Sequence, residues 1–385
     1  MTRIDRLTSI RGFAALYVVL FHCHSTIIRF NLPHLNAFAA KGYLAVDFFF
    51  ILSGFILAYV YTPEFNSGTY SHKRFLALRL GRIYPVHLVT LALAALCISA
   101  PGFDDFWLIH TPASFVSNLL LVQAWGFQGR LSWNFVSWSI STEWFAYLLF
   151  PLFLIASRPL ARRPLMACAA SFIALIVLGA VVSVLMPPGI SAGALHLIIR
   201  APEDAPFSFA ADFGILRIGF EFLAGVLLFR AYNQLGSGNR VWPGWTALVI
   251  SIALFALLRA PWSRAYVLED TLAVVCTAAL ILCLALDSRM LGPLLERRSL
   301  VFLGEASYSI YMTHGVVFLA YLAARDSHWL PPIVTSLDAA LVAAVLLFVT
   351  ITGGIAMYLF VETPARRTAR RWTDRWLALP PTTTS

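Results

Sequence analysis

The sequence predicts an all-α, polytopic integral membrane protein with about ten transmembrane helices and both termini in the cytoplasm. Hydrophobic residues make up 59% of the 385 residues and charged residues only 12%, whereas an ordinary soluble domain contains about 25% charged residues. A chain with so few polar side chains cannot cover a water-soluble globule of this length. The five cysteines lie in apolar stretches without metal-ligand spacing, so we expect neither a disulfide framework nor a metal site.

Apolar windows follow one another along the chain, and a helix needs about 20 such residues to cross the hydrocarbon. In chain order they cover 8–30, 42–61, 84–100, 143–157, 165–186, 213–230, 242–259, 266–286, 301–323 and 334–360. The first window follows Arg3 and Arg6, as a signal peptide would. However, Arg11 interrupts it and no small-residue cleavage site follows, so we expect it to be the first span.

Basic residues collect in alternate connections between these windows, and the other connections lean acidic, such as "GFDDFWLIH". The basic connections carry Lys73, Arg74, Arg79, Arg82, Arg158, Arg162, Arg163, Arg230, Arg240, Arg289, Arg297 and Arg298. Because cytoplasmic loops of membrane proteins are enriched in arginine and lysine, this pattern places both termini in the cytoplasm. The net charge of +9 therefore reflects orientation in a bilayer and not nucleic-acid binding.

The domain organisation is expected to be simple, with residues 1–366 forming the transmembrane domain and residues 367–385 a basic cytoplasmic tail. No internal repeat or second domain is visible. The segment 111–127 is also apolar, but a full span there would move the basic connection 158–163 to the outside. We therefore expect 111–127 to be an interfacial or re-entrant helix on the outer side.

The first window contains ionisable residues at a helical spacing. Arg11 and His22 are eleven residues apart, which at about 100° per residue leaves them about 20° from a common line, with a rise of roughly 16 Å. Alone, the arginine could be an interfacial anchor and the histidine a satisfied core residue. On one helix face they predict a wall of a polar cavity that is entered from the cytoplasm.

The second and third windows add a carboxylate and two arginines. Asp47 lies in the apolar stretch "VDFFFILSGF", so it should pair with His22, His24 or an arginine, or line water. Arg79 and Arg82 in "RLGRIYP" share a helix face just inside the cytoplasmic boundary. Their planar guanidinium groups suit phosphate, although ordinary positive-inside anchoring is the alternative.

The stretch "LSWNFVSWSISTEWF" precedes and opens the fourth window. Tryptophan is enriched at membrane interfaces, so Trp133 and Trp138 are expected at the outer interface. Glu143 is expected beside them, either facing acceptor chemistry or capping a helix N-terminus.

Two later windows carry polar residues at helical spacing. In "LGEASYSIYMTHG", Ser307, Tyr311 and His314 are four and three residues apart, which predicts a polar stripe on one face. In the sixth window Arg217 and Glu221 are four residues apart, a spacing that indicates a structural ion pair.

The ordered set of motifs resembles the membrane-bound acyltransferase type 3 family from Arg3 to Arg366. The motifs are Arg11 with His22, "YLAVDFFFILSGF", "RLGRIYP", "WSISTEW", "FEFLAGVLL", "LGEASYSIYMTHG" and "ETPAR". The resemblance implies about ten spans and transfer of an acyl group, commonly acetyl, from cytoplasmic acyl-CoA to a hydroxyl of a carbohydrate or small molecule.

The resemblance also implies roles for individual residues. His22 is expected to be the catalytic base and Arg11 its partner in the donor channel, while Asp47 and Glu143 complete the expected catalytic set. The expected donor-binding residues are Arg79, Arg82, Ser307, Tyr311 and His314. The sequence departs from the family at Glu143-Trp144, where members often carry two acidic residues, and we expect no appended extracytoplasmic hydrolase-like domain.

The expected partners are acetyl-CoA or another acyl-CoA as donor, the lipid bilayer, and a carbohydrate or lipid-linked glycan as acceptor, with no permanently bound cofactor and no nucleic acid. We expect a bacterial inner-membrane enzyme that takes donor from inside and an acceptor such as a cell-surface polysaccharide or lipopolysaccharide from outside. The alternatives are an acyltransferase of a small molecule such as a macrolide, and a secondary transporter or flippase of a polar or lipid-linked sugar. The sequence lacks the inverted repeat typical of many transporters.

Overall fold

The described part of the chain folds entirely into helices and their connections. The computed structural model describes residues 4–26, 33–99, 109–128, 131–185, 214–236, 242–260, 266–287, 290–330, 333 and 335–376. The α-helices are α1 (Asp5–Thr26), α2 (Pro33–Ala40), α3 (Ala45–Asn66), α4 (His72–Ile98), α5 (Pro112–Leu119), α6 (Trp138–Leu148), α7 (Phe150–Leu160), α8 (Pro164–Leu185), α11 (Gly214–Leu235), α12 (Trp242–Arg259), α13 (Tyr266–Leu286), α14 (Gly292–Leu295), α15 (Arg298–Asp326), α16 (Ser336–Met357) and α17 (Thr363–Trp376). The predicted all-α class is therefore confirmed for these residues.

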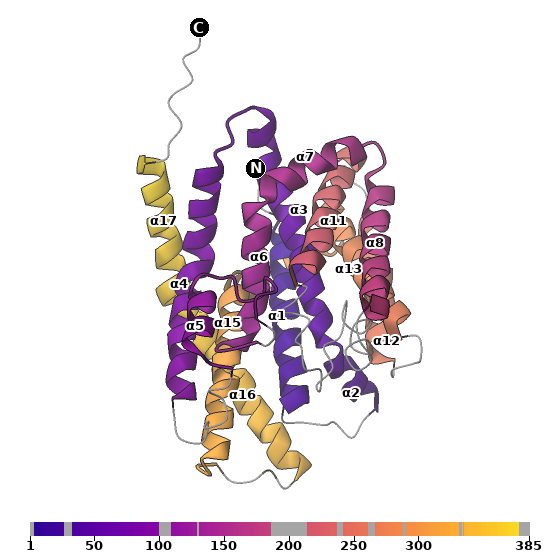
Figure 1. Ribbon diagram of the computed structural model, residues 1–385. Coiled ribbons are helices and arrows are strands. Elements are labelled where there is room, and N and C mark those ends of the chain that lie inside the picture. Colours follow the sequence, from indigo (N-terminus) through magenta and orange to yellow (C-terminus); the bar gives the residue numbers. More distant parts are fainter. Residues whose placement is uncertain are drawn as a thin grey trace.

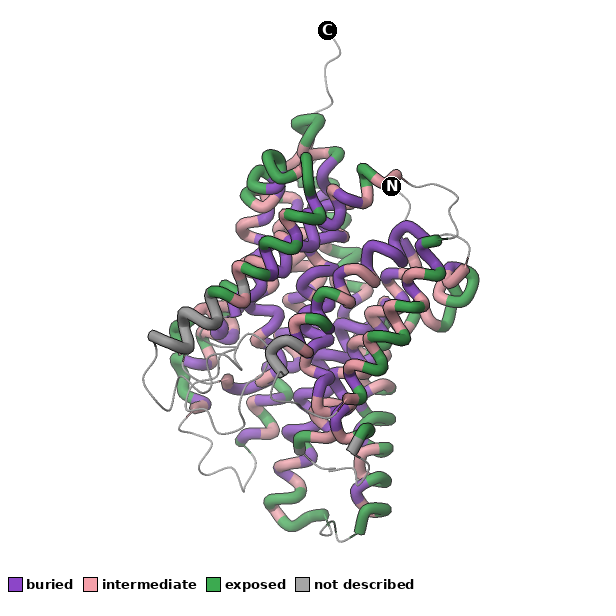
Figure 2. The backbone as a smooth tube through the Cα atoms, turned by 90° about the vertical axis from the view of Figure 1, so that its right-hand side faces the viewer, coloured by how far each residue is buried: buried purple, intermediate pink, exposed green. Residues whose placement is uncertain are grey.

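The long helices form an elongated bundle, with α1, α3 and α15 among its central members and α12, α16 and α17 toward its outside (Figure 1). Figure 2 shows buried residues concentrated along the middle of the bundle and exposed residues at its ends and outer faces. Each apolar window of the sequence contains a helix. Six helices among the described residues are long and apolar enough to cross a membrane, or seven if the bent α6–α7 pair is one span. The chain is thus a multi-pass membrane protein, and the number ten stays a prediction.

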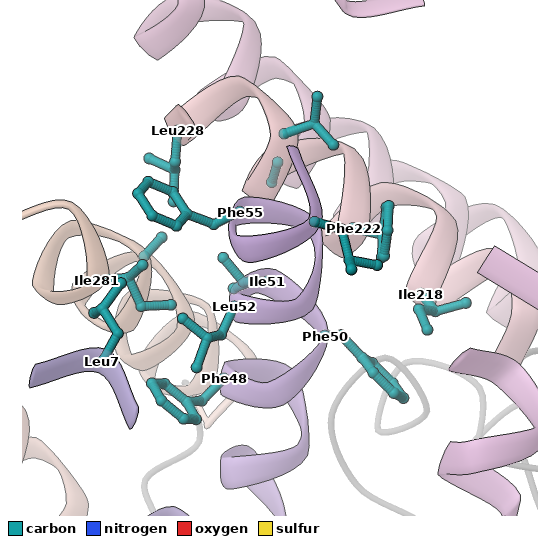
Figure 3. Close-up of a cluster of buried hydrophobic side chains, with 14 of the residues drawn as sticks. Leu7, Phe48, Phe50, Ile51, Leu52, Phe55, Ile218, Phe222, Leu228 and Ile281 are labelled. Atoms are coloured by element: carbon teal, nitrogen blue, oxygen red, sulfur yellow. The ribbon is translucent and has the colours of Figure 1, made fainter. Parts of the chain in front are cut away.

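Small residues let the central helices approach closely. A Cβ atom added to Gly54 of α3 would lie 2.1 Å from the Phe222 carbonyl oxygen, and one added to Gly225 of α11 would lie 2.0 Å from that of Ile51. Around this crossing, Ile51 and Phe55 lie among the clustered apolar side chains of α3, α11 and α13 (Figure 3). Close backbone approach at small residues is a general source of helix association in membranes.

The helices α1 and α15 meet in the same way. A Cβ atom on Gly304 would lie 1.8 Å from the Thr8 carbonyl oxygen, and one on Gly12 would lie 2.7 Å from the Leu303 side chain. The backbones of the two helices are therefore in direct contact near the end of the bundle where α1 begins.

The segment before α6 folds into the protein instead of crossing it. Its helix α5 has only 8 residues, so the prediction that 111–127 is not a full span is confirmed. The Tyr84 hydroxyl donates to the Leu119 carbonyl at 2.9 Å, and His87 Nε2 lies 2.8 Å from the Asn118 carbonyl oxygen. These contacts fix the segment against the middle of α4.

The two tryptophans expected at the outer interface pack against other side chains of the protein, and their depth in the membrane stays a prediction. Trp133 is only 7% exposed and its indole N–H donates to Ser114 Oγ at 3.0 Å. Trp138 packs against Phe50, with ring centroids 6.0 Å apart, and under the Arg217 guanidinium. Trp133 is therefore buried within the folded-in segment, whereas Trp138, the first residue of α6, is half-buried.

The C-terminal helix α17 returns along α4. Its Ala369 side chain lies against Gly81, where an added Cβ would be 2.2 Å away, and its Asp374 pairs with Arg74 at 2.8 Å. The helix α17 therefore ends near the beginning of α4, toward the upper end of the bundle in Figure 1. The beginning of α1 lies in the same half of the bundle, and the membrane face that this end occupies stays a prediction.

Candidate active site

Five helices surround a small central cavity of about 100 Å³. Six of the residues singled out in the sequence line it, namely Arg11, Arg79, Arg82, Glu143, Ser307 and Tyr311. They come from α1, α4, α6 and α15, and α3 contributes Ser53. Of the two α1 residues predicted to form a wall of a polar cavity, Arg11 lines this one and His22 does not, and entry from the cytoplasm stays a prediction.

The central cavity is electropositive. Arg11, Arg79 and Arg82 line it, and Glu143 is the single carboxylate among its described lining residues, so the formal charge of the lining is +2. Low-dielectric walls around charges of one sign strengthen their field. The arrangement therefore favours an anionic ligand.

Glu143 belongs to this arginine-lined cavity and not to the outer interface, so the expected outward position is wrong. The α6 helix starts only at Trp138, after the folded-in segment, and carries Glu143 toward the arginines. The Glu143 carboxylate accepts hydrogen bonds from Ser53 Oγ at 2.7 Å and from the Tyr147 hydroxyl at 2.6 Å. Sequence reasoning missed Tyr147, although its spacing of four residues from Glu143 was a usable signal.

The polar stripe of α15 leads from the central cavity to His22. Tyr311 lines the cavity, and its ring centroid is 5.2 Å from that of His314. The His314 ring centroid is 5.1 Å from that of His22. His314 Nδ1 contacts the Tyr311 carbonyl oxygen, whereas Nε2 has no hydrogen-bond partner among the described residues.

The surroundings of His22 are otherwise aromatic. Phe135 lies 5.1 Å and Phe318 6.3 Å from the His22 ring, measured between centroids. His22 does not line the central cavity itself and lies deeper along α1 than Arg11. The structure thus joins an electropositive cavity to a pair of imidazoles in an apolar shell.

Asp47 pairs with an arginine, which was one of the partners expected for it. Arg217 NH2 lies 2.6 Å and Nε 3.2 Å from Asp47 Oδ1. The same Nε lies 3.3 Å from Glu221 Oε1, so the expected Arg217–Glu221 ion pair is present. Asp47 does not line the central cavity, and the geometry favours a structural role for it.

Glu362 is a further carboxylate that the sequence analysis did not single out. It is fully buried and accepts a hydrogen bond from Ser309 Oγ at 2.7 Å, and Arg366 NH1 lies 3.4 Å away. It also interacts electrostatically with Arg11 and Arg82. Its only sequence signal was membership of the "ETPAR" motif. No group of three or more His, Cys, Asp or Glu side chains suited to a metal occurs in the described ranges.

Comparisons with known proteins agree on one family. The sequence model of the acyltransferase domain, type 3, matches residues 4–359. The chain is 31% identical to the acyltransferase MdmB of Streptomyces mycarofaciens over 95% of its own length and 92% of that protein. It is 26% identical, over 81% of its length, to a Bacillus subtilis protein provisionally named peptidoglycan O-acetyltransferase YrhL, of which it spans 48%. No solved structure matches the chain.

Proposed function

Because the chain belongs to the acyltransferase type 3 family, we propose that this membrane O-acyltransferase takes an acetyl group from cytoplasmic acyl-CoA and transfers it to a hydroxyl of a carbohydrate acceptor. The observation that carries the proposal is the junction between an arginine-lined cavity and the His22–His314 pair. We place the enzyme in a bacterial inner membrane. Family membership gives the transporter alternative no support.

The arginines suit the donor. Acyl-CoA carries several phosphate charges, and guanidinium groups bind phosphate oxygens through paired, charge-assisted hydrogen bonds. Arg79 and Arg82 lie one turn apart on α4 and both reach the central cavity. The narrow cavity would then admit the thin arm of the donor, which carries the thioester inward past Arg11 toward His22.

The histidine pair suits the transfer step. A sugar hydroxyl is a poor nucleophile, and an imidazole within hydrogen-bond reach can remove its proton as it attacks the thioester carbonyl. The new ester C–O bond forms as the C–S bond breaks, and the proton passes through His22 to the departing CoA thiolate. The rings of Phe135 and Phe318 would keep water from competing for the acyl group.

The carbohydrate acceptor is the less constrained part of the proposal. The relative that matches over nearly its full length is named an acyltransferase without an acceptor. Of the two relatives described above, YrhL is the one whose name includes a glycan acceptor, peptidoglycan. The chain spans about half of that protein. A small hydroxylated acceptor such as a macrolide would use the same transfer chemistry.

The test compares two histidines of α1. Purified protein is incubated with acetyl-CoA and a surface glycan, CoA release is followed, and O-acetyl signals are recorded by NMR. His22→Ala should abolish transfer, whereas His24→Ala should keep most of it, because His24 points about 200° away from His22 around the helix. Equal losses at both positions would contradict a catalytic role for His22. CoA release only with a macrolide would move the acceptor to small molecules.

A further inference from the structure

A second cavity lies at the end of the bundle where α3 ends and α4 begins. It measures about 330 Å³, and its lining includes Tyr61, Glu64, Ser71, Arg74, Phe75 and Asp374. We call it the rim cavity. We propose that the rim cavity receives the adenine nucleotide end of acyl-CoA, an inference that rests on the function proposed above.

A thin layer of side chains connects the rim cavity with the central cavity. Arg79 lines the central cavity, and its NH2 group donates to the hydroxyl of Tyr61, a rim residue, at 3.3 Å. The Arg79 guanidinium carbon lies 5.8 Å from the ring centroids of both Tyr61 and Phe75. On the other side, the Phe75 ring is 6.0 Å from that of Tyr147, which lines the central cavity. Arg79 therefore lies between the two cavities.

The order of these features matches the order of groups in the donor. Acyl-CoA consists of a bulky nucleotide, a diphosphate, a thin pantetheine arm and a terminal thioester. The structure presents a cavity of about 330 Å³, then Arg79, then a cavity of about 100 Å³ that leads on to His22. Small-molecule pockets commonly begin near 300 Å³, so of these two cavities the rim cavity has the size for the nucleotide.

The lining of the rim cavity suits an adenine nucleotide. The Glu64 carboxylate can accept a hydrogen bond from the exocyclic amine of the base. The largely buried Tyr61 and Phe75 side chains form part of the cavity wall. Arg74 can bind a phosphate. Its present partner is Asp374 at 2.8 Å, and the two side chains are 32% and 53% exposed. Such solvent-exposed ion pairs contribute little stability, so a phosphate can replace this carboxylate.

A donor without a nucleotide tests the assignment. Initial rates are measured with acetyl-CoA and with acetyl-pantetheine for the wild type and for two variants, Arg74→Ala and Thr69→Phe. Thr69 is a loop residue that lines the rim cavity, so Thr69→Phe puts a ring into the space proposed for the nucleotide. Lys73→Ala is the matched control, because it removes a neighbouring positive charge from an exposed residue that does not line the cavity.

Both rim variants should raise the KM for acetyl-CoA at least about tenfold, as expected for loss of one charged contact or for obstruction of the nucleotide by an added ring, and leave the KM for acetyl-pantetheine unchanged. Lys73→Ala should change neither value. Unchanged KM values for acetyl-CoA, or an equal rise with both donors, would overturn the nucleotide assignment while leaving the acyl-CoA reaction intact. A wild type that accepts neither donor would overturn the proposed function as well.

Discussion

The buried cluster of Asp47, Arg217 and Glu221 allows a sharp prediction about stability. One guanidinium lies 2.6 Å from Asp47 and 3.3 Å from Glu221. Asp47 and Glu221 are at most 2% exposed and the Arg217 side chain is 9% exposed. Arg217→Met would leave two neighbouring carboxylates in the interior of the bundle without their cation. The cluster joins α3 to α11, so its loss should loosen that helix pair.

The magnitude follows from the charges that remain. Removing one partner of a buried ion pair costs about 3–5 kcal/mol, because the other charge is left uncompensated. Asp47→Asn, by contrast, leaves Arg217 paired with Glu221 and loses one charge-assisted hydrogen-bond acceptor, a cost of about 1.5–3 kcal/mol. The double variant Arg217→Met/Asp47→Asn should be more stable than Arg217→Met alone, since it removes one of the two stranded carboxylates.

Thermal unfolding of the purified protein in detergent measures this ranking, and transfer rates well below the unfolding temperature separate stability from chemistry. The midpoint should fall most for Arg217→Met and less for Asp47→Asn. A wild-type midpoint for Arg217→Met would refute the electrostatic argument. A wild-type midpoint combined with lost transfer in Asp47→Asn would give Asp47 the catalytic role that the sequence suggested.

Two further predictions concern the donor site and the packing of the bundle. Arg82→Ala should raise the KM for acyl-CoA and make that KM less sensitive to salt, because salt screens the charge that the variant lacks. An unchanged KM together with reduced membrane insertion would instead indicate that Arg82 only anchors the helix at the cytoplasmic interface. Gly225→Leu should prevent accumulation of folded protein, because a single added Cβ would already lie 2.0 Å from a backbone oxygen of α3. Size-exclusion chromatography in detergent measures this, with Val249→Leu at an exposed position as the control. Elution of both variants at the wild-type volume would contradict the prediction.

Much of the site was predictable because its signals are local. The spacing of Ser307, Tyr311 and His314 depends only on helix periodicity, and the structure places all three along one path. Arg79 and Arg82 likewise share a face of one helix and reach the same cavity.

The error on Glu143, and the contacts that the sequence did not specify, arose where the position of a residue depends on tertiary contacts. The position of Glu143 follows from the folded-in segment, which is held by side chains such as His87 on a different helix. No spacing rule links Asp47 to Arg217, 170 residues away in sequence. The role of Glu362 likewise depends on Ser309 of another helix.

The direct backbone contact between α1 and α15 limits how the enzyme can move during turnover. With Gly304 pressed against Thr8, neither helix can rotate or slide without separating the two backbones. His22 and His314 belong to these two helices, so they keep their spacing as one rigid body. The segment before α6 is fastened to the same pair, because Asn134 Nδ2 donates to the Met312 carbonyl oxygen at 3.1 Å and the Tyr311 hydroxyl donates to the Val136 carbonyl oxygen at 3.0 Å. The chamber around the two imidazoles is therefore preformed in the fold and does not have to assemble anew at each turnover.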